Sequence, residues 1–133
     1  MDTKLLIQLQ PVGTPNCRIT LGHHVQEFTL VQKTTVQIDC VTSGVLIIEH
    51  LGKLDNDPDT AIIIEQIHFN EITSPKFVYQ GIYYPQYPKH LLGGAAELPH
   101  KNYLSWNGSW KLEFTLPIYT WMHKTLGLGW IYD

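Results

Sequence analysis

The sequence predicts an all-β protein, built as a single antiparallel β-sandwich of jelly-roll type, and three observations point to that class. Short segments that alternate apolar and polar residues, or that are rich in β-branched residues, recur at intervals of about ten residues. Gly, Pro or Asn occurs in most of the breaks between these segments, where turns require residues of this kind. The length of 133 residues suits one compact domain, so we expect one domain over residues 1–133.

Seven segments are expected to be strands, and a long loop follows them. The segments are residues 4–10, 17–21, 26–31, 34–41, 44–52, 60–69 and 76–84. Alternation along each strand would place one row of side chains in the core. The stretch from Pro85 to Asn102 is irregular and rich in Pro and Gly. Loops of that length tend to be functional or to cover another surface.

The stretch from residue 103 to residue 119 reads YLSWNGSWKLEFTLPIY and predicts a β-hairpin. An Asn-Gly pair between two alternating runs is typical of a two-residue turn. That turn would place Trp106 on the face opposite the core row, because pairing fixes which side chains share a face. Trp106 would then either pack under a neighbouring loop or be exposed as a contact platform. The expected core row is Trp110, Leu112 and Phe114.

The end of the chain changes from strand to helix pattern. From Pro117 the apolar residues follow a three-four spacing, His123 and Lys124 fall in the last turn, and Gly127 follows. This pattern predicts a short helix that begins just after Pro117. The last seven residues, GLGWIYD, are expected to form a strand or a docked tail, because three large apolar side chains would be costly to expose.

The composition excludes several functions. The net charge is −3, the pI is about 6.1 and no basic cluster is present, so nucleic acid is not expected as a partner. No apolar run approaches the length of a membrane span, and the N-terminal residues do not form a signal peptide. We therefore expect a soluble protein made in the cytosol, with no membrane partner. In that setting Cys17 and Cys40 are expected to be reduced thiols.

The sequence contains few charged residues and none of the common catalytic motifs. Charged residues make up 16%, against about 25% in a typical soluble domain, which suggests that neighbouring molecules cover part of the surface. The seven histidines are scattered. The sequence contains no HExxH, GxSxG, GxGxxG or GxxxxGK[ST] motif and no zinc-type cysteine spacing. We therefore predict a protein that is not an enzyme.

Three carboxylates form a candidate metal site. Asp55, Asp57 and Asp59 occur at every second position, a spacing that can wrap a hard cation such as Ca²⁺ with oxygen ligands. The EF-hand pattern is not met, since Thr60 stands where Gly is needed and Gln66 where a bidentate Glu belongs. The alternative is a solvated, Asp-rich turn.

Aromatic residues in and around the long loop form a candidate binding surface for a sugar or a partner protein. Rigid amphipathic rings suit both roles because they bury a large area at low entropic cost. The alternative is that the first two of them end a strand and pack locally. The candidate residues are Tyr83, Tyr84, Tyr87, Tyr103 and Trp106.

Residues 59–133 resemble a pattern in small β-sandwich virion proteins of tailed phages, especially phages of marine and cyanobacterial hosts. The pattern is DTAIIIEQIHFNEI, then GIYYPQYP, then YLSWNGSWKLEFTLPIYTWM. The resemblance implies a virion structural protein that decorates a capsid or forms part of a tail or fibre. It also implies multiple symmetric copies, contacts with other virion proteins, and a place in the virion after synthesis in the host cytoplasm.

The same order of segments is also similar to calcium-dependent carbohydrate-binding β-sandwich modules, in which an acidic loop holds Ca²⁺ at the sugar site. This resemblance implies an alternative function, a lectin-like module that binds host-surface glycan with the help of Ca²⁺. The sequence departs from those modules at the acidic loop: the three aspartates precede the IIIEQI strand, and no second ligand loop matches.

Overall fold

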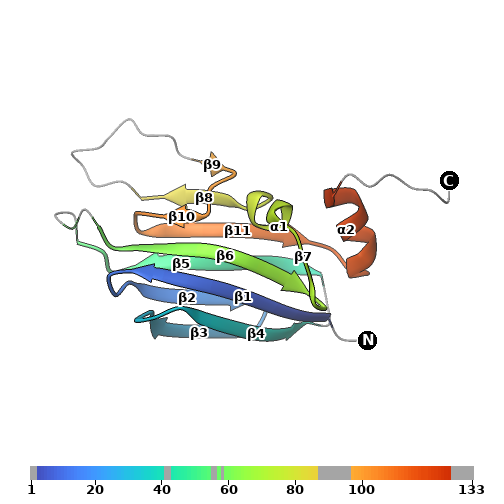
Figure 1. Ribbon diagram of the computed structural model, residues 1–133, viewed down its shortest axis with the longest axis horizontal. Helices are drawn as coiled ribbons and strands as arrows, with labels where there is room; N and C mark the ends of the chain where they lie inside the picture. The colour runs from blue at the N-terminus through green and yellow to red at the C-terminus, as the bar shows by residue number, and fades with distance from the viewer. Residues whose placement is uncertain (1–2, 41–42, 55–56, 58, 87–96, 127–133) are drawn as a thin grey trace.

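The computed structural model describes residues 3–40, 43–54, 57, 59–86 and 97–126. These residues form two antiparallel sheets that lie face to face, with two short helices beside them (Figure 1). The antiparallel β-sandwich predicted from the sequence is therefore confirmed. Within the described part of the chain, no helix is long and apolar enough to cross a membrane.

The first sheet is built around the two longest strands, and one short strand pairs off its main path. Its order is β10 (Tyr103–Leu104), β6 (Ala61–Phe69), β1 (Thr3–Val12) and β4 (Thr34–Cys40), with β7 (Ile72–Thr73) also paired to β6. We call it sheet A.

The second sheet has six strands and lies across the core from sheet A. Its order is β3 (His24–Thr29), β2 (Asn16–Leu21), β5 (Gly44–Leu51), β11 (Gly108–Phe114), β8 (Ile82–Pro85) and β9 (Leu98–Pro99). We call it sheet B.

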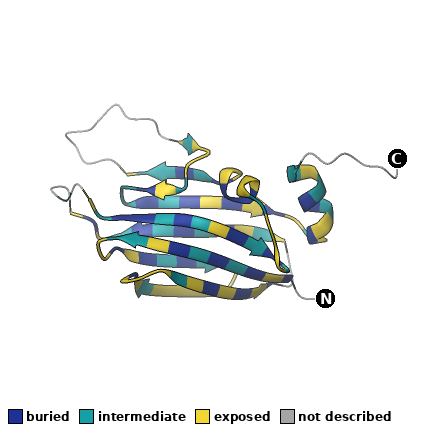
Figure 2. Cartoon of the chain, in the orientation of Figure 1, coloured by how far each residue is buried: buried dark blue, intermediate teal, exposed yellow. Residues whose placement is uncertain are grey.

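The core lies between the two sheets and follows the alternation read from the sequence. Buried and more exposed residues alternate along most strands (Figure 2). The first six predicted strands match β1 to β6 to within three residues at either end. Fully buried side chains of sheet A meet those of sheet B in one cluster; among them are Leu5, Ile7, Leu9, Ile64, Ile67, Ile19, Ile48 and Leu112.

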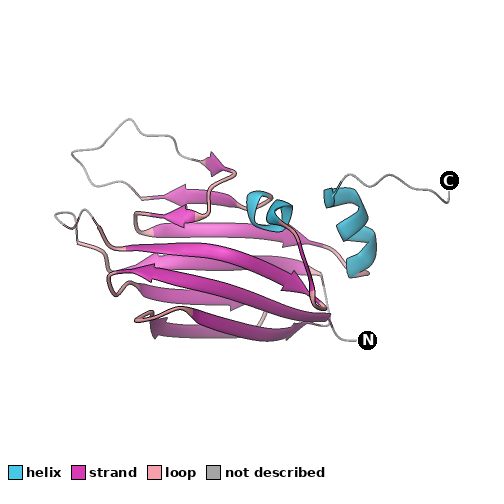
Figure 3. Ribbon diagram, viewed as in Figure 1, coloured by secondary structure: helices cyan, strands magenta, loops and turns pink. Residues whose placement is uncertain are grey.

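The expected strand over residues 76–84 is wrong in its first half. Residues Pro75–Tyr79 form helix α1, and only Ile82–Pro85 form a strand, β8 (Figure 3). The backbone N–H of Lys76 donates to the Ser74 hydroxyl oxygen at 3.3 Å, and Pro75 begins the helix. A capping serine followed by proline favours a helix start, and α1 then buries Phe77 and Val78 against the core.

The expected hairpin at residues 103–116 is also wrong. β10 pairs with β6 in sheet A, whereas β11 pairs with β5 and β8 in sheet B. Asn107 therefore lies where the chain passes from one sheet to the other. Its side chain accepts a hydrogen bond from the Lys53 N–H at 2.8 Å and donates one to the Lys53 carbonyl at 2.9 Å. These contacts hold the crossing, so the Asn-Gly pair does not form a two-residue turn between paired strands.

Gly108 is required by close backbone approach at this crossing. Its φ is 145°, and an added Cβ would lie 2.3 Å from the carbonyl oxygen of Tyr84. The core row predicted beyond it is confirmed, because Trp110, Leu112 and Phe114 are all buried. The sequence therefore predicted which residues of β11 are buried but not which strand pairs with it.

The predicted C-terminal helix is confirmed as α2 (Ile118–Leu126). Its Trp121 packs 5.3 Å from Phe69 and 5.5 Å from Phe77, measured between ring centroids. The Lys76 ammonium of α1 donates to the Leu126 carbonyl at 2.9 Å, so the two helices are neighbours. The predicted tail over residues 127–133 lies outside the described residues.

The two cysteines lie within the core and are not joined by a disulfide. Cys17 lies in β2 and Cys40 in β4, and both are buried. Burial, and to a lesser extent the charge of Glu49, raises the pKa of Cys17 to about 12. This thiol stays protonated near neutral pH and is a poor nucleophile.

Candidate functional site

Trp106 lies half-buried beside the crossing between the two sheets. Its ring is covered by a charged side chain, because the Lys53 ammonium lies 4.5 Å from the ring centroid. Its backbone is held by Tyr83, whose hydroxyl accepts from the Trp106 N–H at 2.9 Å and also contacts the Trp106 carbonyl oxygen. We expected Trp106 to contact the long loop or a partner chain; the contacts described here are with Lys53 and Tyr83, and residues 87–96 lie outside the description.

Lys53 links Trp106 to the acidic segment that follows β5. Its side chain is buried, and its ammonium donates to the Ser105 carbonyl at 2.5 Å and to the Thr60 carbonyl at 2.9 Å. Burial lowers the pKa of Lys53, while the nearby carboxylates of Asp57 and Asp59 raise it. The ammonium therefore links the acidic segment to the crossing through these two hydrogen bonds.

The acidic segment does not form a calcium site from the residues that the structure describes. One oxygen of Asp57 accepts from the N–H groups of Asp59 at 3.0 Å and of Thr60 at 3.1 Å, and the other accepts from the Thr60 hydroxyl. These bonds, the Thr60 hydroxyl first, lower the pKa of Asp57 to about 2. Asp59 is exposed, and Asp55 lies outside the described residues. Among described residues, no group of three His, Cys, Asp or Glu side chains could hold a metal ion.

His50 is a buried titratable group beneath this end of the sandwich. Its Nδ1 lies 2.9 Å from the Leu104 carbonyl oxygen. A carbonyl only accepts, so Nδ1 carries the proton and Nε2 is left as an acceptor. Within the described residues, Nε2 has no hydrogen-bond partner. Burial is the main cause that lowers the pKa of His50, so the imidazole is neutral in the folded protein at pH 7.

This burial predicts a pH dependence of stability. The unfolded histidine titrates near 6.5 and the folded one lower, so below about pH 6.5 the unfolded chain binds more protons. The free energy of unfolding should therefore fall as the pH drops below 6.5, by at most ~1.4 kcal/mol per pH unit for this one group. Urea unfolding of the wild type and of His50→Leu across this pH range tests it. An unchanged pH dependence in the variant would contradict the assignment.

Of the five predicted aromatic residues, the four that the structure describes do not form one platform. Tyr83 is buried at 1% exposure, so its ring offers no surface to a ligand. Tyr84 faces outward on sheet B, with the Lys111 ammonium 5.2 Å from its ring centroid. Tyr103 is 43% exposed on β10, in sheet A. Tyr87 lies outside the described residues.

A different polar site, which the sequence reasoning missed, begins at a β-bulge in β6. Gln8 of β1 lies opposite Gln66, and the next residue, Leu9, lies opposite Ile64. Glu65 is therefore an extra residue in β6. Ile64 and Ile67 are both buried, whereas Glu65 and Gln66 are not. The bulge thus places a carboxylate and an amide next to each other on the outer face of sheet A. Bulges often redirect side chains in this way next to active sites.

The bulge borders a groove of about 220 Å³ between β6 and α1. The groove is lined by the bulge residues Glu65 and Gln66, by Thr73 and Ser74 before α1, by Pro75, Val78 and Tyr79 of α1, and by Asn102. Asn102 is fixed to β6, since its side-chain amide donates to the Ile64 carbonyl at 3.1 Å and its own carbonyl accepts from the Ile64 N–H at 2.8 Å.

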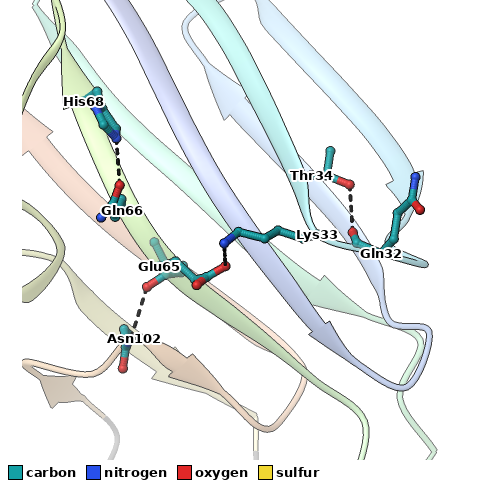
Figure 4. Close-up of polar contacts among 8 residues, drawn as sticks. Gln32, Lys33, Thr34, Glu65, Gln66, His68 and Asn102 are labelled. Atoms are coloured by element: carbon teal, nitrogen blue, oxygen red, sulfur yellow. Dashed lines mark hydrogen bonds and ion pairs between the residues drawn. The ribbon is translucent and has the colours of Figure 1, made fainter.

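The polar side chains around the bulge are held in place by neighbours (Figure 4). The Lys33 ammonium lies 3.3 Å from Glu65 Oε1. His68 Nε2 lies 3.0 Å from Gln66 Oε1, so the imidazole donates and the Gln66 amide group keeps its own donors for a ligand. A spacing of three between Ile64 and Ile67, where the rest of the strand alternates by two, was the sequence signal for this bulge.

Comparisons with known proteins identify the fold of the chain. No protein-family model matches the sequence, and a search of curated proteins finds no match. Among solved structures, the chain is similar to "vCBM60 in complex with galactobiose", with a TM-score of 0.61, 13% identity, and coverage of 83% of this chain and 97% of that one. A second structure of vCBM60 has a TM-score of 0.57 at 14% identity and covers 84% of this chain and 90% of its own. Its title refers to two families of calcium-dependent carbohydrate binding modules.

The similarity therefore extends over almost the whole of each solved module. At this level of identity it shows a shared fold, the β-sandwich of these carbohydrate-binding modules. A fold of this kind hosts many functions, so any function must be argued from the surface of this chain.

Proposed function

We propose that the protein is a non-catalytic module that binds carbohydrate. The observation that carries the proposal is the fold, which this chain shares with two structures of a carbohydrate-binding module over more than four-fifths of its length. One of those structures is described as a complex with galactobiose, an uncharged disaccharide.

The surface of sheet A supports this proposal. Its outward-facing side chains include the amides of Gln8, Gln10, Gln37 and Gln66, together with the exposed ring of Tyr103. Amide groups both donate and accept, which matches the paired donor and acceptor character of sugar hydroxyls. Tyrosine adds an apolar face with a polar edge. A surface with these groups and little net charge suits a neutral polyhydroxylated ligand.

The first test is a binding measurement on the intact chain. Galactobiose, and then a panel of immobilised glycans, is presented to the purified protein, and saturable binding is expected for at least one neutral oligosaccharide. Protein unfolded in urea serves as the control, because a folded surface is required. Absence of binding to every neutral glycan in the panel would contradict the proposed function.

A second binding measurement tests whether glycan binding depends on Ca²⁺. The described residues do not fit a calcium site by themselves, because the Asp57 carboxylate accepts bonds from Asp59 and Thr60. The binding measurement is therefore repeated with added Ca²⁺ and with EDTA. Loss of binding in EDTA, restored by Ca²⁺, would support a calcium site that includes Asp55, outside the described residues. Equal binding in both conditions would favour recognition by the protein's own side chains.

The virion role implied by the phage resemblance stays a prediction. The structural comparisons are with carbohydrate-binding modules, and they favour the glycan-binding alternative over a purely structural role. The two roles are compatible, because a virion component can itself bind a host glycan. Location in a virion and assembly with other virion proteins would be tested by mass spectrometry of intact particles.

A further inference from the structure

We propose that the groove between the β6 bulge and helix α1 is the sugar-binding site and that it holds one neutral sugar unit of a glycan. This inference rests on the proposed function, since it assigns a place and a ligand class to it. It departs from the sequence-based expectation, which placed binding at Trp106 and the tyrosines in and around the long loop, with a metal site at the acidic segment.

The size of the groove limits the ligand. Pockets for drug-sized ligands are typically about 300–1,000 Å³, and this groove measures about 220 Å³. It therefore suits a single small ring. A glycan would insert one residue and extend the rest along the open face of sheet A.

The charge in the groove favours a neutral ligand. Glu65 contributes a carboxylate, but the Lys33 ammonium lies 3.3 Å from its Oε1 and offsets the charge. Oε1 is buried and paired with Lys33, but the Glu65 side chain as a whole remains 27% exposed. A ligand hydroxyl would therefore donate to the other carboxylate oxygen, Oε2.

Two further groups supply donors to the ligand. The Gln66 carbonyl oxygen is 3.0 Å from His68 Nε2, so its amide N–H groups remain for a sugar oxygen. The Ser74 hydroxyl oxygen already accepts from the Lys76 N–H at 3.3 Å, which leaves its proton free to be donated. An acceptor on Glu65 and donors on Gln66 and Ser74 together match a row of sugar hydroxyls.

Tyr79 gives the groove its aromatic wall. It lies at the C-terminal end of α1 and is 45% exposed. Its backbone carbonyl is 3.1 Å from His100 Nδ1, which anchors this end of the helix. A sugar ring has apolar C–H faces and a polar rim, so an exposed tyrosine beside a carboxylate and an amide complements both.

The experiment compares matched surface variants by calorimetric titration with galactobiose, or with the tightest neutral oligosaccharide found in the glycan panel. Tyr79→Ala should weaken the affinity about tenfold or more, as loss of a central aromatic contact commonly does. Glu65→Gln should weaken it by about three- to tenfold, because it replaces a charged acceptor with a neutral one. Tyr119→Ala removes a similarly exposed tyrosine, at 50%, from helix α2 and should leave the affinity unchanged.

A second measurement needs no variant. Titration of isotope-labelled wild-type protein with the same sugar should shift the NMR amide signals of Glu65, Gln66 and Ser74. If the wild type binds the sugar while Tyr79→Ala and Glu65→Gln keep full affinity, or if the shifts concentrate at Lys53 and Trp106, the groove assignment is overturned and the proposed function stands. If the wild type binds no neutral glycan, both are overturned.

Discussion

Gly81→Ala is expected to destabilise the protein by about 3 kcal/mol or more, although it adds a single methyl group. Gly81 follows α1 and precedes β8, and the ring of Trp110 lies directly against it. A Cβ at this position would lie 2.1 Å from two ring carbons of Trp110 and 2.5 Å from its Nε1. Trp110 is completely buried, so its ring cannot swing aside without disturbing the packed core.

A double-mutant cycle tests whether this clash is the cause. Trp110→Phe shortens the ring system and removes an N–H that has no hydrogen-bond partner among the described residues. If the overlap explains the loss, Gly81→Ala should cost clearly less in the Trp110→Phe background than alone. Gly44→Ala is the matched control, because its added Cβ would meet only an ordinary contact, at 3.4 Å from Leu21. Equal costs of Gly81→Ala in both backgrounds, measured by urea unfolding, would refute the explanation.

Trp110→Ala is expected to cost about 3–5 kcal/mol of folding stability, the usual range for removing a large buried ring. Trp106→Ala should cost much less, about 1–2 kcal/mol. Its ring is only half-buried, and its described side-chain contact is with the Lys53 ammonium, a contact of a kind worth about 0.5–2 kcal/mol. The two tryptophans flank the same Asn-Gly pair yet have different structural roles.

Thermal and urea unfolding of both variants provide the measurement. Trp106→Phe is the control, because it keeps an aromatic face for Lys53 and should recover most of the stability lost in Trp106→Ala. Equal destabilisation by Trp106→Ala and Trp110→Ala would show that both rings act as core residues. If Trp106→Ala lost glycan affinity while Tyr79→Ala kept it, the binding site would lie at the crossing between the sheets and not in the groove.

The parts of the fold that depend on local pattern could be predicted from the sequence. Alternation of apolar and polar residues located β1 to β6, because all of these strands except β3 bury one row of side chains and leave the other more exposed. The three-four spacing of apolar residues after Pro117 located α2, because this helix buries one face, with Ile118, Trp121 and Met122. The buried row Trp110, Leu112 and Phe114 could be predicted from alternation along one strand, without knowing which strand pairs with it.

Features that depend on distant contacts could not be predicted in this way. The Asn-Gly pair suggested a tight turn, but the Asn107 side chain bonds to the backbone of Lys53, 54 residues away. Helix α1 contains residues with high strand propensity, and its Ser-Pro start decided the outcome locally. Five aromatic residues close in sequence were expected to share a surface, yet alternation along β8 buries Tyr83 and leaves Tyr84 half-buried on the other side of the sheet.

The groove was missed because its residues come from separate segments. Glu65 and Gln66 belong to a strand, Ser74 and Tyr79 to a helix and its cap, and Asn102 to the approach to β10. Only their pairing in three dimensions brings them together. The irregular isoleucine spacing in β6 is the one local signal, and it indicates a bulge without saying what the bulge faces.

The extra residue in β6 means that the side chains facing the groove and the side chains forming the core are different residues of the same strand. On either side of Glu65 the strand keeps its buried isoleucines in register with β1, so the residues that would select a ligand contribute almost nothing to the core. If the groove binds sugar as proposed, substitutions at residues 65 and 66 would change the groups that meet the ligand while the buried isoleucines stay in place. At the bulge, changes in ligand preference would then be uncoupled from changes in the core.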